Sequence, residues 1–302
     1  MKNARFTEYL MLELGNSEEH PFGEVRVSEG ENVKFAFEAY GVSVSVAADG
    51  ADLGKKLFEV ANRAMLGKCR ALDPSLVRAE HGFLVSSRKD GTYDLTSVGE
   101  YTTGAGELRE TLELFVRILR IKVSQFAKNW VFVHAGVVSW GGKAIIIPGD
   151  SGSGKTTLVA ECVKRGALYY SDEYAVLSPD GLVHPFARAL SITNGGRKWS
   201  EDGIPVEKLG GRAATEPIEV GAVVLTKYNS GARWNPERLT PGNGIIEVIP
   251  HTIPMTINAD FSLQVLKSAL SRAIILKGVR GEASDLAIEL FSFSNKELTT
   301  LN

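Results

Sequence analysis

The stretch GDSGSGKT, residues 149–156, decides the fold of this chain. It satisfies the eight-position pattern G-x-x-x-x-G-K-[ST], in which a glycine-rich loop surrounds phosphate groups. An apolar run, residues 144–147, precedes the loop, and an apolar-periodic segment, residues 157–163, follows it. The sequence therefore predicts a strand, a phosphate-binding loop and a helix in direct succession. A glycine-rich turn that matches the pattern by chance is the alternative.

The residue types in this loop suit a nucleoside triphosphate. Gly149, Gly152 and Gly154 permit backbone angles at which a side chain would clash, so successive N–H groups can converge on phosphate oxygens. Lys155 is expected to neutralise the β and γ oxygens, and the Thr156 hydroxyl is expected to bind Mg²⁺. We predict ATP and Mg²⁺ as cofactors, and the sequence leaves a preference for GTP open. The predicted nucleotide-binding residues are Gly149, Asp150, Ser151, Gly152, Ser153, Gly154, Lys155, Thr156 and Thr157.

An acidic pair, Asp172 and Glu173, follows the predicted helix and one short strand, residues 168–171. A helix that returns to an adjacent strand would place these carboxylates at the carboxyl end of that strand, where ligands of open α/β sheets gather. One carboxylate could accept a proton from an attacking hydroxyl, and the other could hold Mg²⁺ directly or through water. The alternative is a pair of solvated acids in a turn.

Two large classes of nucleotide-binding protein fit the sequence poorly. A transporter-type ATPase would carry an LSGGQ-like signature, which does not occur. A guanine-binding protein would carry Asn/Thr-Lys-x-Asp after a strand, whereas residues 226–229 read TKYN and end in asparagine. The remaining classes include kinases.

The order of four segments is more restrictive than the loop alone. HAGVV (134–138) leads to the glycine-rich loop, then to KRG (164–166) and YSDE (170–173). Over residues 131–185 this order resembles the catalytic core of HPr kinase/phosphorylase and its kinase relatives. The resemblance implies a fold like that of phosphoenolpyruvate carboxykinase and the phosphorylation of a serine. Members of this family often form homo-oligomers, so the resemblance also makes a homo-oligomer an expectation.

Carried over residue by residue, the resemblance makes Asp172 the general base and puts Glu173 in the place of a second acid. His134 lies where the family has its active-site histidine, although a core histidine at a strand end is an equal alternative. Residues 206–212, VEKLGGR, match the family's Glu-x-Arg-Gly-x-Gly segment only weakly. This weak match argues against a phosphorylase activity. The predicted catalytic residues are Asp172, Lys155 and His134, and the predicted metal ligands are Thr156, Glu173 and Asp172.

The length of 302 residues suggests two domains. Residues 1–127 are predicted to form a smaller α+β domain with a hairpin at 33–47, a helix at 53–66 capped by Asp52, a hairpin at 81–98 and a long helix at 107–127. Residues 128–302 are predicted to form an α/β domain, a P-loop sheet with flanking helices.

The later part of this second domain has weaker signals. Residues 194–212 contain five glycines and many charges, which predicts a mobile loop or lid. A helix is expected at 263–270, a turn at 278–281 and a final strand at 287–293. Arg188 is a candidate to reach the phosphate site as a cation, although an ordinary surface arginine is the more common situation.

Composition excludes several function classes. With 34 basic and 36 acidic residues the net charge is −2, which does not suit a protein that binds nucleic acid through bulk positive charge. The first residues lack the apolar core of a signal peptide, no segment suits a membrane span, and there are two cysteines. We therefore expect a cytoplasmic protein with no membrane partner.

Together these features predict a kinase that transfers the γ-phosphoryl group of ATP to a serine or other hydroxyl of a protein, peptide or small molecule. A nucleotide-dependent switch or binding protein with little kinase activity is the alternative. The sequence does not identify the acceptor.

Overall fold

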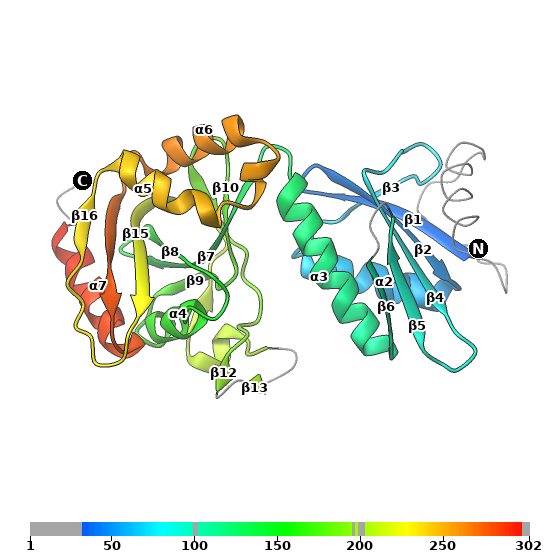
Figure 1. Ribbon diagram of the computed structural model, residues 1–302, viewed down its shortest axis with the longest axis horizontal. Coiled ribbons are helices and arrows are strands. Elements are labelled where there is room, and N and C mark those ends of the chain that lie inside the picture. Colours follow the sequence, from blue (N-terminus) through cyan, green and yellow to red (C-terminus); the bar gives the residue numbers. More distant parts are fainter. Residues whose placement is uncertain (1–31, 99–101, 195–196, 199–202, 298–302) are drawn as a thin grey trace. The chain divides into compact units, whose positions relative to one another are not determined.

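The computed structural model describes residues 32–98, 102–194, 197–198 and 203–297 (Figure 1). The chain divides into two compact units, Met1–Lys128 and Asn129–Asn302. Each unit contains its own large sheet. The chain is thus a mixed α/β protein with two large sheets, and β12 (Thr193–Asn194) and β13 (Arg197–Lys198) form a further two-stranded sheet.

The first unit is built on a six-stranded sheet. Its strands are β1 (Asn32–Ala39), β2 (Val42–Asp49), β3 (Arg70–Leu72), β4 (His81–Ser87), β5 (Tyr93–Ser97) and β6 (Thr102–Gly106), in the order β3-β1-β2-β4-β5-β6. Both predicted hairpins are present as β1–β2 and β4–β5. Tyr40 and Gly41 have φ angles of 52° and 81°, as a tight two-residue turn requires.

Two helices, α2 (Ala51–Ala64) and α3 (Leu108–Phe126), belong to the first unit. The prediction that Asp52 caps α2 is wrong, because the capping position is Gly50, with a φ of 84°. Asp52 instead lies in the first turn, where a negative charge interacts favourably with the helix dipole. At the start of α3, the Glu110 carboxylate accepts a hydrogen bond from the Glu107 N–H (3.3 Å).

The second unit is built on a nine-stranded sheet. Its strands are β7 (Val131–Trp140), β8 (Lys143–Pro148), β9 (Leu168–Ser171), β10 (Tyr174–Leu177), β11 (Leu182–His184), β14 (Arg212–Ala213), β15 (Ile218–Tyr228), β16 (Glu237–Leu239) and β17 (Ile274–Arg280). β8, β9, β14, β15 and β17 all run in the same direction. Their carboxyl ends therefore meet at one edge, where the loops that follow them can share a ligand.

β9 and β10 form one interrupted strand along the same edge of β7. Ser171 pairs with Val137 and Tyr174 pairs with His134, so the register is the same on both sides of the interruption. The Glu173 carbonyl accepts a hydrogen bond from the Ala135 N–H (3.1 Å), which keeps the interruption against β7. The acidic pair therefore sits at a local break in the pairing with β7, and a register shift follows between Val137 and Val138.

Helices cover both faces of the second sheet (Figure 1). α4 (Lys155–Lys164) and α7 (Ala283–Glu297) share one apolar core, and α6 (Ala259–Leu270) contributes to the other, beside α5 (Pro241–Val248). Alternate residues of β8 point into the two apolar cores on opposite faces of the sheet. Ile146 faces the α6 side, whereas Ile145 and Ile147 face the α4 side.

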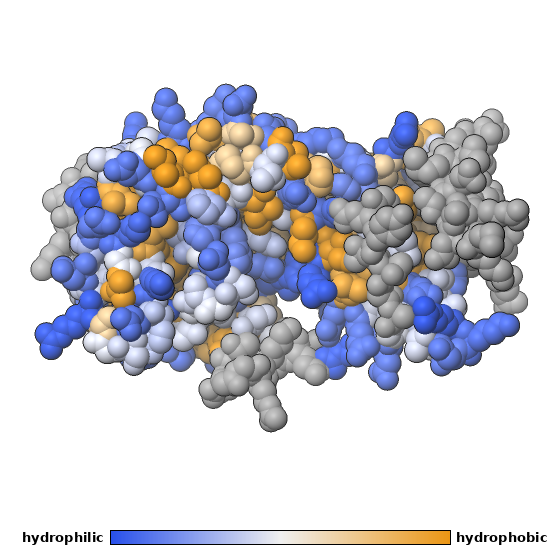
Figure 2. Space-filling view, in the orientation of Figure 1, coloured by the Kyte–Doolittle hydropathy of each residue, from blue (hydrophilic) through white to orange (hydrophobic). Residues whose placement is uncertain are grey.

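The outer surface over α5 and α6 is partly apolar (Figure 2). Ile246 on α5 and Ile257 just before α6 are 64% and 51% exposed. Among the residues that the structure describes, no helix combines the length and the apolar character that crossing a membrane would require.

Two predictions for the end of the chain are wrong. Residues 287–293 lie within α7 and not in a strand, because Ala283, Leu286, Ala287 and Leu290 are buried at helical spacing. The turn expected at 278–281 begins inside β17, which extends to Arg280.

The predicted lid at 194–212 is only partly within the described residues. Ile204 pairs with Leu190, and Val206 in the short 3₁₀ helix η1 (Val206–Leu209) is 4% exposed. Arg212 begins β14 and pairs with Leu168 of the sheet. Residues 203–212 are therefore attached to the rest of the second unit through Ile204, Val206 and Arg212. Residues 195–196 and 199–202 lie outside the described parts.

Gly136 lies across from Asp172 in the register between β7 and the interrupted strand, and it packs against α4. A Cβ atom at this position would lie 2.6 Å from Cγ2 of Val159. We expect Gly136→Ala to lower the free energy of unfolding by about 1–3 kcal/mol, because Val159 or the helix must move. Thermal unfolding measures this effect. Gly242→Ala is the matched control, because nothing lies within 4 Å of its added Cβ; equal losses in both variants would contradict the packing argument.

Candidate functional site

The glycine-rich loop, residues 149–154, connects the carboxyl end of β8 to the first residue of α4. Gly152 and Gly154 adopt left-handed backbone angles, with φ of 81° and 86°. A Cβ at Gly149 would lie 2.8 Å from Oγ of Ser153, so a larger residue there would require the Ser153 side chain to move. The predicted order of strand, loop and helix is present.

Lys155 is the first residue of α4, and its side chain turns back across the loop. The ammonium donates hydrogen bonds to the carbonyls of Gly149 (2.7 Å) and Asp150 (2.8 Å). The residue is 8% exposed, and this burial lowers the pKa of Lys155, whereas the charges of Asp150, Asp172 and Glu173 act in the opposite direction. The loop therefore has a fixed, nearly buried cation across it.

Asp172 lies at the carboxyl end of β9, beside the first turn of α4. Its carboxylate accepts hydrogen bonds from the Tyr169 hydroxyl (2.9 Å) and the Ser191 N–H (3.2 Å), and the Thr156 hydroxyl lies close enough to lower the pKa of Asp172. Burial raises the pKa of Asp172, and these hydrogen bonds partly oppose the rise. The structure thus brings the predicted acid into contact with the predicted Mg²⁺-binding threonine.

Glu173 has a different environment from Asp172. Its carboxylate forms an ion pair with the guanidinium of Arg188. Arg188, the candidate cation of the phosphate site, thus contacts the second acid of the pair, and its approach to a bound phosphate stays a prediction. Within the described residues, no group of three or more His, Cys, Asp or Glu side chains could hold a metal ion. Beside nucleotides, Mg²⁺ is commonly held by one or two protein oxygen atoms together with phosphate oxygens and water, so such a cluster is not needed there.

Two histidines lie near the mouth of the loop. The carbonyl of His134, on β7, accepts a hydrogen bond from the Gly149 N–H (3.3 Å). His251 ends the 3₁₀ helix η2 (Ile249–His251), and its Nδ1 is 3.5 Å from Oδ1 of Asp150. A bridge between Val133 and Thr252 holds this segment against β7.

Sequence reasoning missed His251. It is nearly a hundred residues from the loop, and no local pattern links the two segments. Among the predicted binding residues, Asp150, Ser151 and Gly152 are exposed at the rim of the loop, and Thr157 is exposed in the first turn of α4.

Acidic pH is expected to destabilise the fold through His134. Burial and the nearby Lys155 and His251 lower the pKa of His134 from its ordinary 6.5 to about 4. Between these pH values the unfolded chain binds a proton that the folded chain does not, so stability is lost as the pH falls from 6.5 towards 4. Thermal unfolding of wild type and His134→Asn at pH 7, 6 and 5 measures this effect. The variant should show a weaker pH dependence, and identical curves would contradict the assignment.

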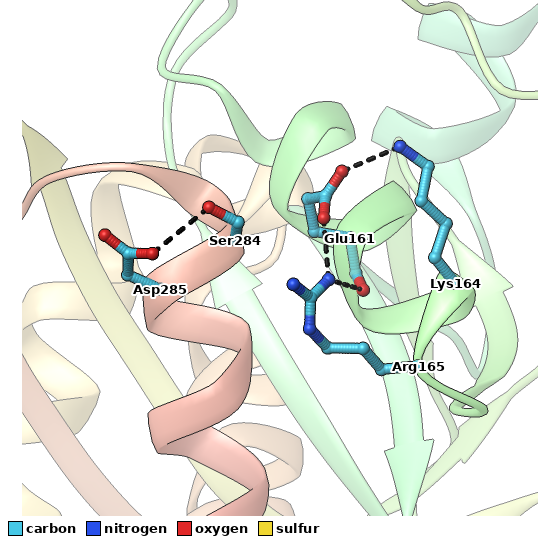
Figure 3. Close-up of polar contacts among 5 residues, drawn as sticks. All are labelled: Glu161, Lys164, Arg165, Ser284 and Asp285. Carbon is cyan, nitrogen blue, oxygen red and sulfur yellow. Dashed lines mark hydrogen bonds and ion pairs between the residues drawn. The ribbon is translucent and has the colours of Figure 1, made fainter.

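The KRG segment closes the far end of α4 (Figure 3). Arg165 donates hydrogen bonds to the carboxylate (2.6 Å) and the carbonyl (3.0 Å) of Glu161, and Lys164 binds the same carboxylate (2.7 Å). Gly166 follows with a φ of 99°, which ends the helix. These residues therefore act locally, at the opposite end of the helix from the loop.

Comparisons with known proteins give limited information. No protein-family model matches the sequence, and no curated protein matches it. Among solved structures, the chain is similar to the Hpr(Ser) kinase/phosphatase from Coxiella burnetii, with 15% sequence identity and a TM-score of 0.30. The match covers 57% of this chain and 99% of the other.

Proposed function

We propose that this chain is an ATP- and Mg²⁺-dependent kinase that transfers the γ-phosphoryl group to a hydroxyl, with a serine of a protein or peptide as the expected acceptor. The observation that carries the proposal is the contact between Asp172 and Thr156. A buried carboxylate beside the first turn of α4 supports a role for Asp172 in the chemistry of a phosphate bound at the loop. An acid beside this threonine also suits Mg²⁺ binding in a nucleotide-dependent switch, and the assay below distinguishes that switch from a kinase.

The loop and Lys155 bind and orient the phosphates in this proposal. Main-chain N–H groups and the start of α4 face the β-phosphate, and the Lys155 ammonium stabilises the negative charge of the β and γ oxygens. Thr156 and Asp172 supply oxygen atoms of the kind that Mg²⁺ prefers. When bound, Mg²⁺ would neutralise the charge that develops on the phosphate oxygens.

Asp172 accepts the proton of the attacking hydroxyl. The acceptor oxygen forms a bond to the γ-phosphorus as the bond to the leaving ADP oxygen breaks, and the hydroxyl proton moves to the Asp172 carboxylate. Its raised pKa makes this carboxylate a stronger base than an exposed aspartate. The Tyr169 hydroxyl and the Ser191 N–H hold the carboxylate in position.

Glu173 and the histidines have supporting roles. Arg188 neutralises Glu173, which leaves Asp172 as the basic carboxylate of the pair. His134 is uncharged at neutral pH, and it and His251 can donate hydrogen bonds to a phosphate oxygen or to the acceptor.

The test is transfer of labelled phosphate from γ-labelled ATP with Mg²⁺ into peptide libraries and free serine, followed by mass spectrometry of the products. A phosphorylated serine product that requires Mg²⁺ and the glycine-rich loop supports the proposal. Tight ATP binding without any phosphorylated acceptor, together with a partner whose affinity depends on the bound nucleotide, would instead identify a nucleotide-dependent switch.

A further inference from the structure

Arg280 is a buried cation behind the glycine-rich loop. It is the last residue of β17, and β15 lies between β17 and β8 in the sheet. The three parallel strands place Arg280 at the same edge as the loop, and the residue is 3% exposed. Its position was not suggested by any motif, because 124 residues separate it from Thr156 in the sequence.

The guanidinium binds the last two carbonyls of the loop. Its Nη2 donates hydrogen bonds to the carbonyls of Ser153 (3.3 Å) and Gly154 (3.4 Å), while Nη1 binds the carbonyl of Gly281 (2.9 Å). A Cβ at Gly154 would lie 2.5 Å from Nη2, so this approach requires glycine. Arg280 and Gly154 therefore fit together as a pair.

The contacts of Arg280 with these carbonyls also determine where the neighbouring N–H groups of the loop point. In a trans peptide the C=O and the following N–H point in opposite directions. When the carbonyls of Ser153 and Gly154 point towards Arg280, the N–H groups of Gly154 and Lys155 must point away from it. This is the side on which bound phosphates would lie in the loop.

The charge of Arg280 is also unusual. In the described parts of the chain, no carboxylate forms an ion pair with the guanidinium, which lies over the ring of Tyr228 at 5.3 Å. Burial lowers the pKa of Arg280, and the charge of nearby Glu282 opposes this effect. Nε of Arg280 and Oγ1 of Thr226 are both buried without a hydrogen-bond partner, and both residues line the same narrow recess beside Lys155. A buried positive charge held mainly by carbonyls is costly unless it interacts with an anion.

We propose that Arg280 is a positioning residue for nucleotide binding. It holds the final peptide groups of the loop so that their N–H groups face the phosphates, and its positive charge adds to the attraction for the triphosphate. The inference rests on the proposed nucleotide binding and names a group outside the glycine-rich loop that this binding requires.

The experiment compares Arg280→Gln and Arg280→Lys with wild type by calorimetric titration of ATP and Mg²⁺. We expect the Kd for ATP to rise roughly 10- to 100-fold in Arg280→Gln, because hydrogen bonds to a charged group are lost. Arg280→Lys should lie between Arg280→Gln and wild type, since it keeps the charge but not the fork of donors. In turnover assays the KM for ATP should rise more than kcat falls.

Lys227→Gln is the matched control, because Lys227 is an exposed cation near the end of neighbouring β15, and its Kd should not change. Unfolding temperatures separate the alternatives. A lower unfolding temperature with an unchanged Kd in the folded variants would show a purely structural residue and overturn the inference. If Arg280→Gln does not fold, the Kd for ATP of folded Arg280→Lys provides the test: an increase supports the inference and an unchanged value overturns it. Failure of the wild type to bind ATP would overturn the proposed function itself.

Discussion

Asp172→Asn is expected to lower kcat for phosphoryl transfer by roughly 10²- to 10⁴-fold, which is the usual contribution of a positioned general base. Asparagine has nearly the same shape, and its carbonyl oxygen can still accept the hydrogen bond from the Tyr169 hydroxyl, which is 2.9 Å long in the wild type. It cannot accept the proton of the attacking hydroxyl. The Kd for ATP should therefore change far less than kcat, as titration and single-turnover kinetics would measure.

The matched control for this variant is Asp285→Asn. Asp285 is an exposed aspartate in the first turn of α7, where its carboxylate accepts a hydrogen bond from Ser284 (Figure 3). This control should keep wild-type kcat. Undiminished transfer by Asp172→Asn would remove Asp172 from the mechanism, whereas a loss of ATP binding equal to the loss of turnover would assign it to metal or nucleotide binding.

Lys155→Met is expected to lower kcat/KM by roughly 10²- to 10³-fold and to raise the Kd for ATP, because a preorganised cation no longer faces the phosphate oxygens. Methionine fills a similar volume, so the 8% exposed site should stay packed. The carbonyls of Gly149 and Asp150 lose their donor, which would also loosen the loop. Steady-state kinetics and titration with ATP would measure both effects.

Lys164→Met is the control within the same helix. Lys164 is half-exposed and pairs with Glu161 at the surface, so its loss should cost little stability and no activity. A Kd for ATP in Lys155→Met equal to that of wild type would contradict the proposed role of the loop.

The parts of the site that lie close together in the sequence could be predicted from it. The strand before Gly149, the loop and α4 are encoded within about 25 residues, and the short return to β9 brings Asp172 back to the same edge. Local steric requirements of glycine and the periodicity of apolar residues are sufficient for these elements.

The remaining parts depend on contacts between distant segments. His251 and Arg280 reach the loop only through the packing of the 3₁₀ helices on β7 and through the order of the parallel strands. The ion pair of Glu173 could not be foreseen for the same reason, since Arg188 follows a separate strand. The final strand was wrongly predicted because the apolar residues of α7 occur close together. A short stretch of such residues does not distinguish the helical period of about 3.6 residues from the strand period of about 2.

The unbroken register across Asp172 and Glu173 limits how this site can be altered. Exchanging either acid for another residue leaves the pairing of β10 with His134 and its neighbours intact. Inserting or deleting a single residue there would instead rotate β10 by half a turn, so that Ala175 and Leu177 would leave the core they share with α6. Substitutions at Asp172 and Glu173 can therefore change the chemistry of this edge without moving β10. Insertions and deletions are expected to be tolerated only outside residues 171–174.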